Sequence, residues 1–210
     1  MLEWSEYLKF FAGLFAIVNP IGAIPLYLNL TTHQEVSTRN RTSLYASITV
    51  LLVLAVSLIM GEAILRFFAI SIASFRVAGG ILILLMAIAM MQARMSPVKQ
   101  TDEETQDAAE KNSIAVVPIG LPLLAGPGAI STMILYAHRD ASLAHYLMGM
   151  VEIGVVALSV WLCLRLAPKI GSFLGRTGIN IVGRIMGLII AALGVEFIGN
   201  GLKQLLPGLA

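Results

Sequence analysis

The chain has 210 residues, of which 58% are hydrophobic and only 12% are charged, and its mean hydropathy is +0.86. A soluble domain of this length needs more polar surface, so the composition predicts an integral membrane protein that crosses the bilayer several times. The net charge of +2 and the lack of basic clusters with interleaved aromatics argue against a nucleic-acid partner. The sequence shows no zinc-ligand spacing, and we expect no metal or other cofactor. The lone cysteine, Cys163, rules out an internal disulfide.

In chain order, six apolar stretches reach the length of about 20 residues that an α-helix needs to cross a bilayer. They are expected at residues 7–31, 43–61, 74–93, 114–137, 144–165 and 181–202. The first stretch lacks the features of a signal peptide, so we expect it to remain in the mature protein. The sequence therefore predicts an all-α membrane protein with six transmembrane helices.

The longest polar stretch, residues 94–112, separates two halves that resemble each other. At a nearly constant separation, Pro20 matches Pro127, and the segment that begins at Arg76 matches the segment that begins at Arg184. Such self-similarity is typical of an internal repeat. Because each repeat has an odd number of spans, the two would be inverted relative to each other. The expected units are a first repeat at 1–93, a cytoplasmic linker at 94–112 and a second repeat at 113–210.

Lysine and arginine are more frequent in the loops on the linker's side of the membrane than on the side of the two termini. The positive-inside rule then places both termini outside the cytoplasm. The expected location is a bacterial inner membrane with periplasmic termini, and the sequence does not indicate an oligomeric state.

The first and fourth apolar stretches each contain a helix-breaking motif. The first motif is Asn19-Pro20-Ile21-Gly22-Ala23-Ile24-Pro25, and the second is Ala125-Gly126-Pro127-Gly128-Ala129-Ile130-Ser131. Proline removes a backbone N–H and clashes with the preceding turn, while glycine is unfavourable inside a helix. Within hydrocarbon, the freed backbone groups are tolerated only where protein or a water-filled cavity covers them. Paired interruptions of this kind mark the binding site in transporters built from repeats, so solute transport is the leading hypothesis.

The half-helices that begin after each break should expose backbone N–H groups at their positive dipole ends, where an anion binds. These donors are expected from Gly22, Ala23 and Ile24 in the first motif and from Gly128, Ala129 and Ile130 in the second. The half-helices that end at Val18 and Ala125 present carbonyl groups that suit an ammonium group. Side-chain hydrogen bonds would come from Asn19, Ser131 and Thr132. Together these groups predict a small zwitterionic solute.

A simpler alternative is that both motifs are proline kinks that only shape helix packing. Two carboxyl groups inside the expected spans, those of Glu152 and Glu196, are candidates for carrying a coupling proton. Each could instead form a hydrogen bond between helices or lie near a helix end. Glu152 shares one helical stripe with His145 and Ser159.

Two glycine spacings, Gly171-x-x-x-Gly175 and Gly183-x-x-x-Gly187, predict close packing between helices. The expected spans do not bring together a Ser/His/Asp or metal-type cluster, so we do not expect an enzyme.

Four segments closely resemble the MarC family of bacterial and archaeal inner-membrane proteins and, within it, the YchE and SnatA types. They are residues 14–25, 74–81, 122–130 and 184–188. The resemblance covers essentially the whole chain. It implies a six-span protein with inverted three-span repeats and discontinuous first and fourth helices.

The MarC family includes an archaeal transporter of neutral amino acids, so the resemblance implies small neutral substrates such as glycine and alanine. By motif, it assigns Asn19, Pro20, Gly22 and Pro25 to the first broken helix and Gly126, Pro127, Gly128 and Ser131 to the second. We therefore expect a secondary transporter that works by alternating access. The alternatives are a drug efflux protein, which the association of the family name with multiple antibiotic resistance raises, and a membrane scaffold that transports nothing.

Overall fold

The computed structural model describes residues 3–31, 34–92, 124–206 and 208, and all regular secondary structure in these ranges is helical. The helices are α1 (Trp4–Val18), α2 (Ile24–Leu30), α3 (Val36–Phe67), α4 (Ile72–Met91), α6 (Pro127–Ala137), α7 (Leu143–Arg165) and α8 (Ala167–Leu205). This result confirms the all-α prediction. The expected linker at 94–112 and the first part of the fourth expected span, 114–123, lie outside the described residues.

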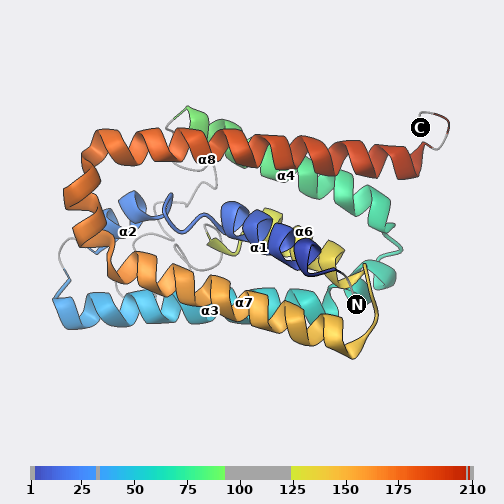
Figure 1. Ribbon diagram of the computed structural model, residues 1–210, viewed down its shortest axis with the longest axis horizontal. Coiled ribbons are helices and arrows are strands. Elements are labelled where there is room, and N and C mark those ends of the chain that lie inside the picture. The colour runs from blue at the N-terminus through green and yellow to red at the C-terminus, as the bar shows by residue number, and fades with distance from the viewer. Residues whose placement is uncertain (1–2, 32–33, 93–123, 207, 209–210) are drawn as a thin grey trace.

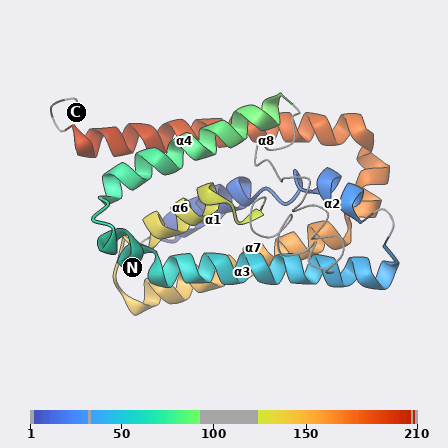
Figure 2. The same ribbon diagram turned by 180° about the vertical axis from the view of Figure 1, so that it is seen from behind.

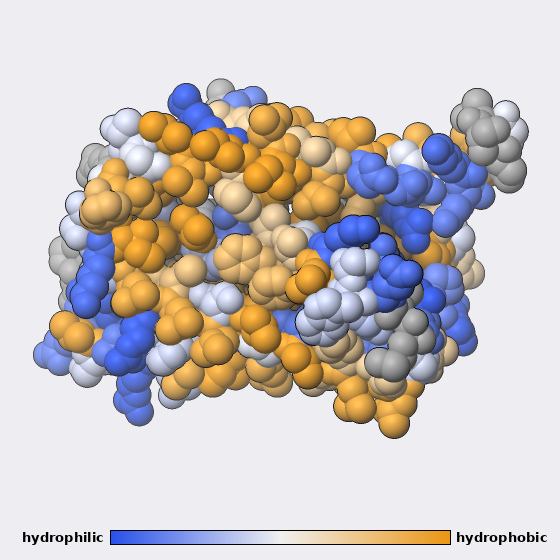
Figure 3. Space-filling model, in the orientation of Figure 1, coloured by the Kyte–Doolittle hydropathy of each residue, from blue (hydrophilic) through white to orange (hydrophobic). Residues whose placement is uncertain are grey.

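Within the described ranges, four helices are long and apolar enough to cross a membrane, namely α3, α4, α7 and the part of α8 from Thr177 to Leu205. A shorter apolar helix, α6, accompanies them. Figure 3 shows hydrophobic residues over the middle of the molecule and hydrophilic residues gathered toward its two ends. Exposed apolar side chains such as Ile59 on α3 and Leu188 on α8 fit a surface that contacts lipid.

Helix α3 extends beyond both ends of the apolar stretch expected at 43–61, whereas α4 and α7 begin and end close to their expected bounds. A helix requires continued backbone hydrogen bonds but not continued apolar side chains. Exposed residues such as Arg41 and Arg66 therefore continue α3 at its two ends, where their charged groups reach water. The apolar stretch expected at 43–61 thus lies within α3, but hydropathy underestimated the length of the helix.

The helices form three layers (Figures 1 and 2). One outer layer is the pair α4 and α8, the other is the pair α3 and α7, and α1, α2 and α6 lie between them. The two helices of each outer pair run antiparallel, and α1 and α6 also run in opposite directions. The start of α1 and the end of α8 lie at the same end of the molecule.

Glycines allow α4 and α8 to approach each other closely. A Cβ atom at Gly194 would lie 2.9 Å from the carbonyl oxygen of Gly80, and a Cβ atom at Gly80 would lie 2.7 Å from the carbonyl oxygen of Gly194. Cβ atoms at Gly187 and Gly201 would also lie within 3.1 Å of a backbone carbonyl oxygen of α4. Because the three α8 glycines recur at every seventh residue, they form one stripe that faces α4.

The two glycine spacings singled out in the sequence give a mixed result. Gly187 packs closely against α4, but a Cβ atom at Gly183 or Gly175 would have no neighbour within 4 Å. Gly175 instead has a φ of 61° and a ψ of −179°, and it produces the kink near the start of α8 (Figure 1). The packing prediction is therefore wrong for Gly175 and Gly183, because a spacing defines a helix face but not the partner that covers it.

Candidate functional site

The first predicted break separates α1 from α2. Helix α1 ends at Val18, and the N–H group of Asn19 still donates to the carbonyl oxygen of Phe15 at 2.9 Å. Asn19 itself has a φ of 49° and a ψ of 61°, which is a left-handed conformation that asparagine adopts more readily than most residues. Pro20 follows and cannot donate a backbone hydrogen bond, so the chain leaves the helix here.

The Asn19 side chain stabilises the conformation of the first break through two hydrogen bonds. Its Oδ1 atom accepts a hydrogen bond from the Gly22 N–H group at 3.2 Å, and its Nδ2 group donates to Sδ of Met90 in α4 at 3.4 Å. A Cβ atom at Gly22 would lie 2.1 Å from Nδ2 of Asn19, so position 22 has no space for a side chain while Asn19 keeps this conformation. Position 22 of the first motif thus requires glycine, because any larger residue would clash with the Asn19 side chain.

Not all the donors expected after the first break are free. The Gly22 N–H group donates to Asn19, and the Ile24 N–H group donates to the carbonyl oxygen of Ile21 at 3.1 Å. The expectation of free N–H groups is wrong for these two residues, because the turn before α2 uses them itself. Of the three expected donors, only that of Ala23 lacks an acceptor in the described part of the chain.

The second predicted break precedes α6. Gly126 is extended, Pro127 is the first residue of the helix, and the Ile130 N–H group donates to the carbonyl oxygen of Gly126 at 3.1 Å. Proline suits this first position because its missing N–H would have no intrahelical partner. Within the described ranges, the N–H groups of Gly128 and Ala129 have no acceptor. These two groups are therefore the donors that the start of α6 can offer to a ligand.

The last turn of α1 meets the first turn of α6 near the middle of the bundle (Figures 1 and 2). A Cβ atom at Gly128 would lie 3.4 Å from Cγ2 of Ile17 and 2.8 Å from Cγ1 of Ile83 in α4. The next turn of α6 packs as closely, since a Cβ atom at Gly79 would lie 2.7 Å from Cβ of Ser131. Helix α4 thus contacts both breaks.

The remaining polar candidates are placed differently. Ser131 and Thr132 are buried, and the Thr132 hydroxyl donates to the carbonyl oxygen of Gly128 at 2.8 Å. Glu152 is buried on α7. Glu196 is exposed on α8 and accepts a hydrogen bond from Asn200 at 2.9 Å. The acidic candidates therefore do not share one environment, and neither of them belongs to a break.

Several contact residues were not singled out from the sequence. Ile17, Ile83 and Met90 are apolar residues in apolar spans, and only the tertiary structure shows that they touch the breaks. The adjacent pair Gly79 and Gly80 could have indicated from the sequence that other helices pack closely against α4. Two glycines in one helix turn allow close approach on two neighbouring faces.

These helices define a multi-pass, all-helical integral membrane protein with interrupted backbone at its centre. The chain matches the family model described as MarC family integral membrane protein over residues 4–206. It belongs to the MarC family, as the sequence motifs predicted.

The relatives share nearly the whole length of the chain. The UPF0056 membrane protein YhcE of Escherichia coli (strain K12) is 46% identical over 207 residues, which are 99% of this chain and 96% of the relative. A UPF0056 membrane protein of Buchnera aphidicola (subsp. Schizaphis graminum) is 42% identical over 209 residues, which are 100% of this chain and 97% of the relative. YvbG of Bacillus subtilis (strain 168) is 36% identical over 207 residues, covering 98% of each chain. No solved structure matches the chain.

Proposed function

We propose that this protein is a secondary transporter that moves small neutral amino acids, such as glycine and alanine, by alternating access. The observation that carries the proposal is the contact of Ile17, at the end of α1, with Gly128, at the start of α6. Interrupted helices that meet inside a bundle provide backbone dipoles for solute binding in repeat-built transporters.

The pairing of the helices supports an architecture of six spans in two inverted repeats, with interrupted first and fourth helices. Helix α1 packs with α6, α3 packs with α7, and α4 packs with α8. The two members of every pair run in opposite directions (Figures 1 and 2). Inverted repeats have this relation because the axis between them lies in the membrane plane. In the proposed cycle, one repeat rocks against the other around the site.

In the proposed complex, opposite ends of the solute contact the two broken helices. The solute carboxylate accepts hydrogen bonds from the Gly128 and Ala129 N–H groups, which have no acceptor within the described residues. The ammonium group contacts carbonyl groups in the last turn of α1, where the helix dipole is negative. The other motif residues line the site, namely Asn19, Pro20, Gly22, Ala23, Ile24, Gly126, Pro127, Ile130, Ser131 and Thr132.

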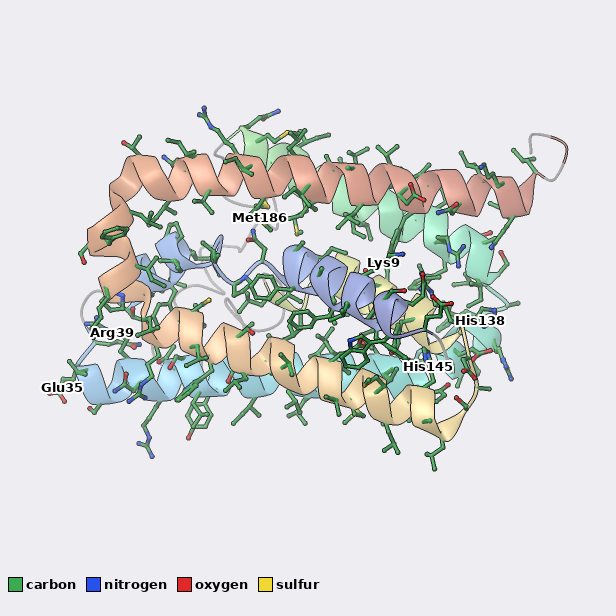
Figure 4. The ribbon with its side chains drawn as sticks, viewed as in Figure 1. Lys9, Glu35, Arg39, His138, His145 and Met186 are labelled. Atoms are coloured by element: carbon green, nitrogen blue, oxygen red, sulfur yellow. The ribbon has the colours of Figure 1, made fainter. Side chains whose placement is uncertain are left out.

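The charge distribution supports an inner-membrane orientation with periplasmic termini. Figure 4 shows Lys9 and His138 at the end of the molecule where α1 begins, and Glu35 and Arg39 at the opposite end. Arg41 accompanies Arg39 at the start of α3, on the side expected to be cytoplasmic.

Two rival functions remain distinguishable from amino-acid transport. Efflux of lipophilic drugs requires a wide apolar cavity, and the close packing of Gly128 against Ile17 and Ile83 does not favour one. A scaffold without transport would use both breaks only for packing, so it would bind no solute.

A thermal-shift screen of the purified protein tests the proposal. A ligand at roughly 100 times its Kd stabilises the folded state by about 2.7 kcal/mol, so glycine or alanine should raise the melting temperature by several degrees. The Gly128→Leu variant should lose this shift, because its side chain fills the start of α6 and displaces Ile83. A lipophilic cation should cause no shift.

Uptake into liposomes that contain the purified protein completes the test. The proposal predicts accumulation of labelled alanine or glycine. Export of a lipophilic cation without amino-acid flux would instead support efflux, and the absence of both binding and flux for every neutral amino acid would support a scaffold.

A further inference from the structure

Four buried polar side chains from three helices gather on the side of the breaks toward the chain termini. Tyr7 of α1, Tyr136 of α6 and His145 and Glu152 of α7 are each at most 6% exposed. Within the described residues, no hydrogen bond reaches the Tyr7 or Tyr136 hydroxyl, Nδ1 of His145 or either carboxyl oxygen of Glu152. Buried polar groups without partners are unusual and costly in a protein interior.

Gly149 explains how α6 packs against this face of α7. His145, Gly149 and Glu152 follow one another along one side of the helix, at spacings of four and three residues. A Cβ atom at Gly149 would lie 2.9 Å from Cε1 of Tyr136, so the tyrosine ring occupies the space above this glycine. The Glu152 side chain follows Gly149 by one turn on the same face of α7. Tyr7 of α1 lies nearby, with its ring centroid 6.1 Å from that of His145.

Aromatic stacking fixes the Tyr136 ring in this position. Phe10 of α1 stacks on it with ring centroids 3.8 Å apart, and His145 stacks on it with centroids 4.2 Å apart. Figure 4 shows His145 between α7 and α1. The cluster therefore joins α1, from the first half of the chain, to α6 and α7, from the second half.

The hydrogen bond of His145 determines its tautomer. Its Nε2 atom lies 2.9 Å from the carbonyl oxygen of Tyr136, which can only accept a hydrogen bond. Nε2 must therefore carry a proton, and in the neutral ring Nδ1 keeps a lone pair. The buried Nδ1 atom can thus accept a hydrogen bond within the cluster.

We propose that Tyr7, Tyr136 and Glu152 form a proton-binding site, separate from the two breaks, in which the proton is held as the carboxylic acid of Glu152. An ionised carboxylate buried without a cation is strongly disfavoured, whereas the neutral acid can share its proton with a phenol oxygen. A metal ion is a poorer occupant, because the described residues contain no group of three or more acidic, histidine or cysteine side chains that could hold one.

Among the residues that the structure describes, the groups around the site do not supply a buried counter-charge for Glu152. Helix α3 faces Gly149 with the apolar side chain of Leu58. Arg139, two residues after α6, is half exposed and pairs with Glu6 at 3.5 Å. His138 lies at the same end and pairs with Glu62 of α3 at 3.4 Å.

The location between the two halves gives the site a role in coupling. If the proposed transport holds, release of the proton leaves a negative charge in the cluster that joins α1 to α6 and α7, which weakens their contact and favours separation of the repeats. Protonation restores the neutral, tightly packed state.

Infrared spectroscopy of the lipid-embedded protein tests proton binding without any solute. The wild type should show a protonated carboxyl band at neutral pH, and this band should disappear in Glu152→Gln, an isosteric change. The Tyr136→Phe variant should retain the band at a shifted frequency, because the phenol oxygen beside it is gone. The matched control is Glu196→Gln, which removes an exposed glutamate and should leave the band unchanged.

The outcomes separate this site from the transport proposal. A band that Glu152→Gln leaves intact, or that sodium ions abolish at constant pH, would overturn proton binding at Glu152. Melting curves of all three variants verify that they fold. If the Glu152 band is present but no amino acid binds, the proton site stands and the proposed transport fails.

Discussion

Replacing Gly194 with leucine should lower the free energy of unfolding by about 3 kcal/mol or more. The Cβ atom alone would lie 2.9 Å from the carbonyl oxygen of Gly80 and 3.0 Å from the backbone nitrogen of Leu84. These neighbours are backbone atoms of α4, which cannot move aside as the end of a side chain can. The two helices must separate, and they lose contact along the whole glycine stripe. Denaturation of the purified protein in detergent measures the effect.

Gly183→Leu is the matched control, because it introduces the same side chain in the same helix. In the described part of the chain, no atom outside the adjacent turns of α8 lies within 4 Å of a Cβ at Gly183. Its leucine should project into lipid and change the unfolding free energy by less than about 1 kcal/mol. Equal stability losses in the two variants would show that α4 and α8 do not pack through the stripe at Gly194.

Gly22→Ala should reduce amino-acid uptake at least tenfold while lowering the unfolding free energy by about 2 kcal/mol. The added methyl group would lie 2.1 Å from Nδ2 of Asn19, so the asparagine side chain must leave its position. Its hydrogen bonds to the Gly22 N–H group and to Met90 are then lost, and the first break changes shape. Uptake into liposomes and denaturation in detergent measure the two effects.

The control for this variant is Gly13→Ala in α1, where an added Cβ has no neighbour within 4 Å. Alanine is the better helix former, so this change should raise stability by up to about 1 kcal/mol and leave uptake intact. Uptake by Gly22→Ala at the wild-type rate would mean that the conformation of Asn19 is not needed for transport.

The sequence located the end of α1 and the start of α6 because their cause is local. Pro20 and Pro127 stop helical hydrogen bonding wherever the chain folds, and α1 and α6 end and begin beside them. The free donors were predicted less well, since the Asn19 side chain and the Ile21 carbonyl accept two of them. Such local acceptors depend on the exact backbone path through the break.

The partners of each helix could not be predicted, because they depend on tertiary packing. Periodicity placed His145, Glu152 and Ser159 on one stripe, yet the structure buries the first two and leaves Ser159 half-buried. Helix α7 is covered by α6 only along part of its length. Tyr7 and Tyr136 were not linked to Glu152 for the same reason, since they come from helices whose contact with α7 depends on tertiary packing.

The central claim is that the end of α1 and the start of α6 meet inside the membrane, and cysteine cross-linking tests it most directly. Ile17→Cys combined with Gly128→Cys, in a chain with Cys163→Ser, should form a disulfide under mild oxidation in native membranes. A Cβ atom at residue 128 would lie 3.4 Å from Cγ2 of Ile17, so the two introduced side chains would be in contact. A saturating neutral amino acid should slow the reaction.

Gly13→Cys combined with Gly128→Cys, in the same Cys163→Ser chain, is the negative control, because a Cβ at Gly13 has no neighbour within 4 Å. The account predicts that the 17–128 pair cross-links and the 13–128 pair does not. A 17–128 pair that stays reduced while both cysteines react with small thiol reagents would contradict it, because the two interrupted helices would then not meet.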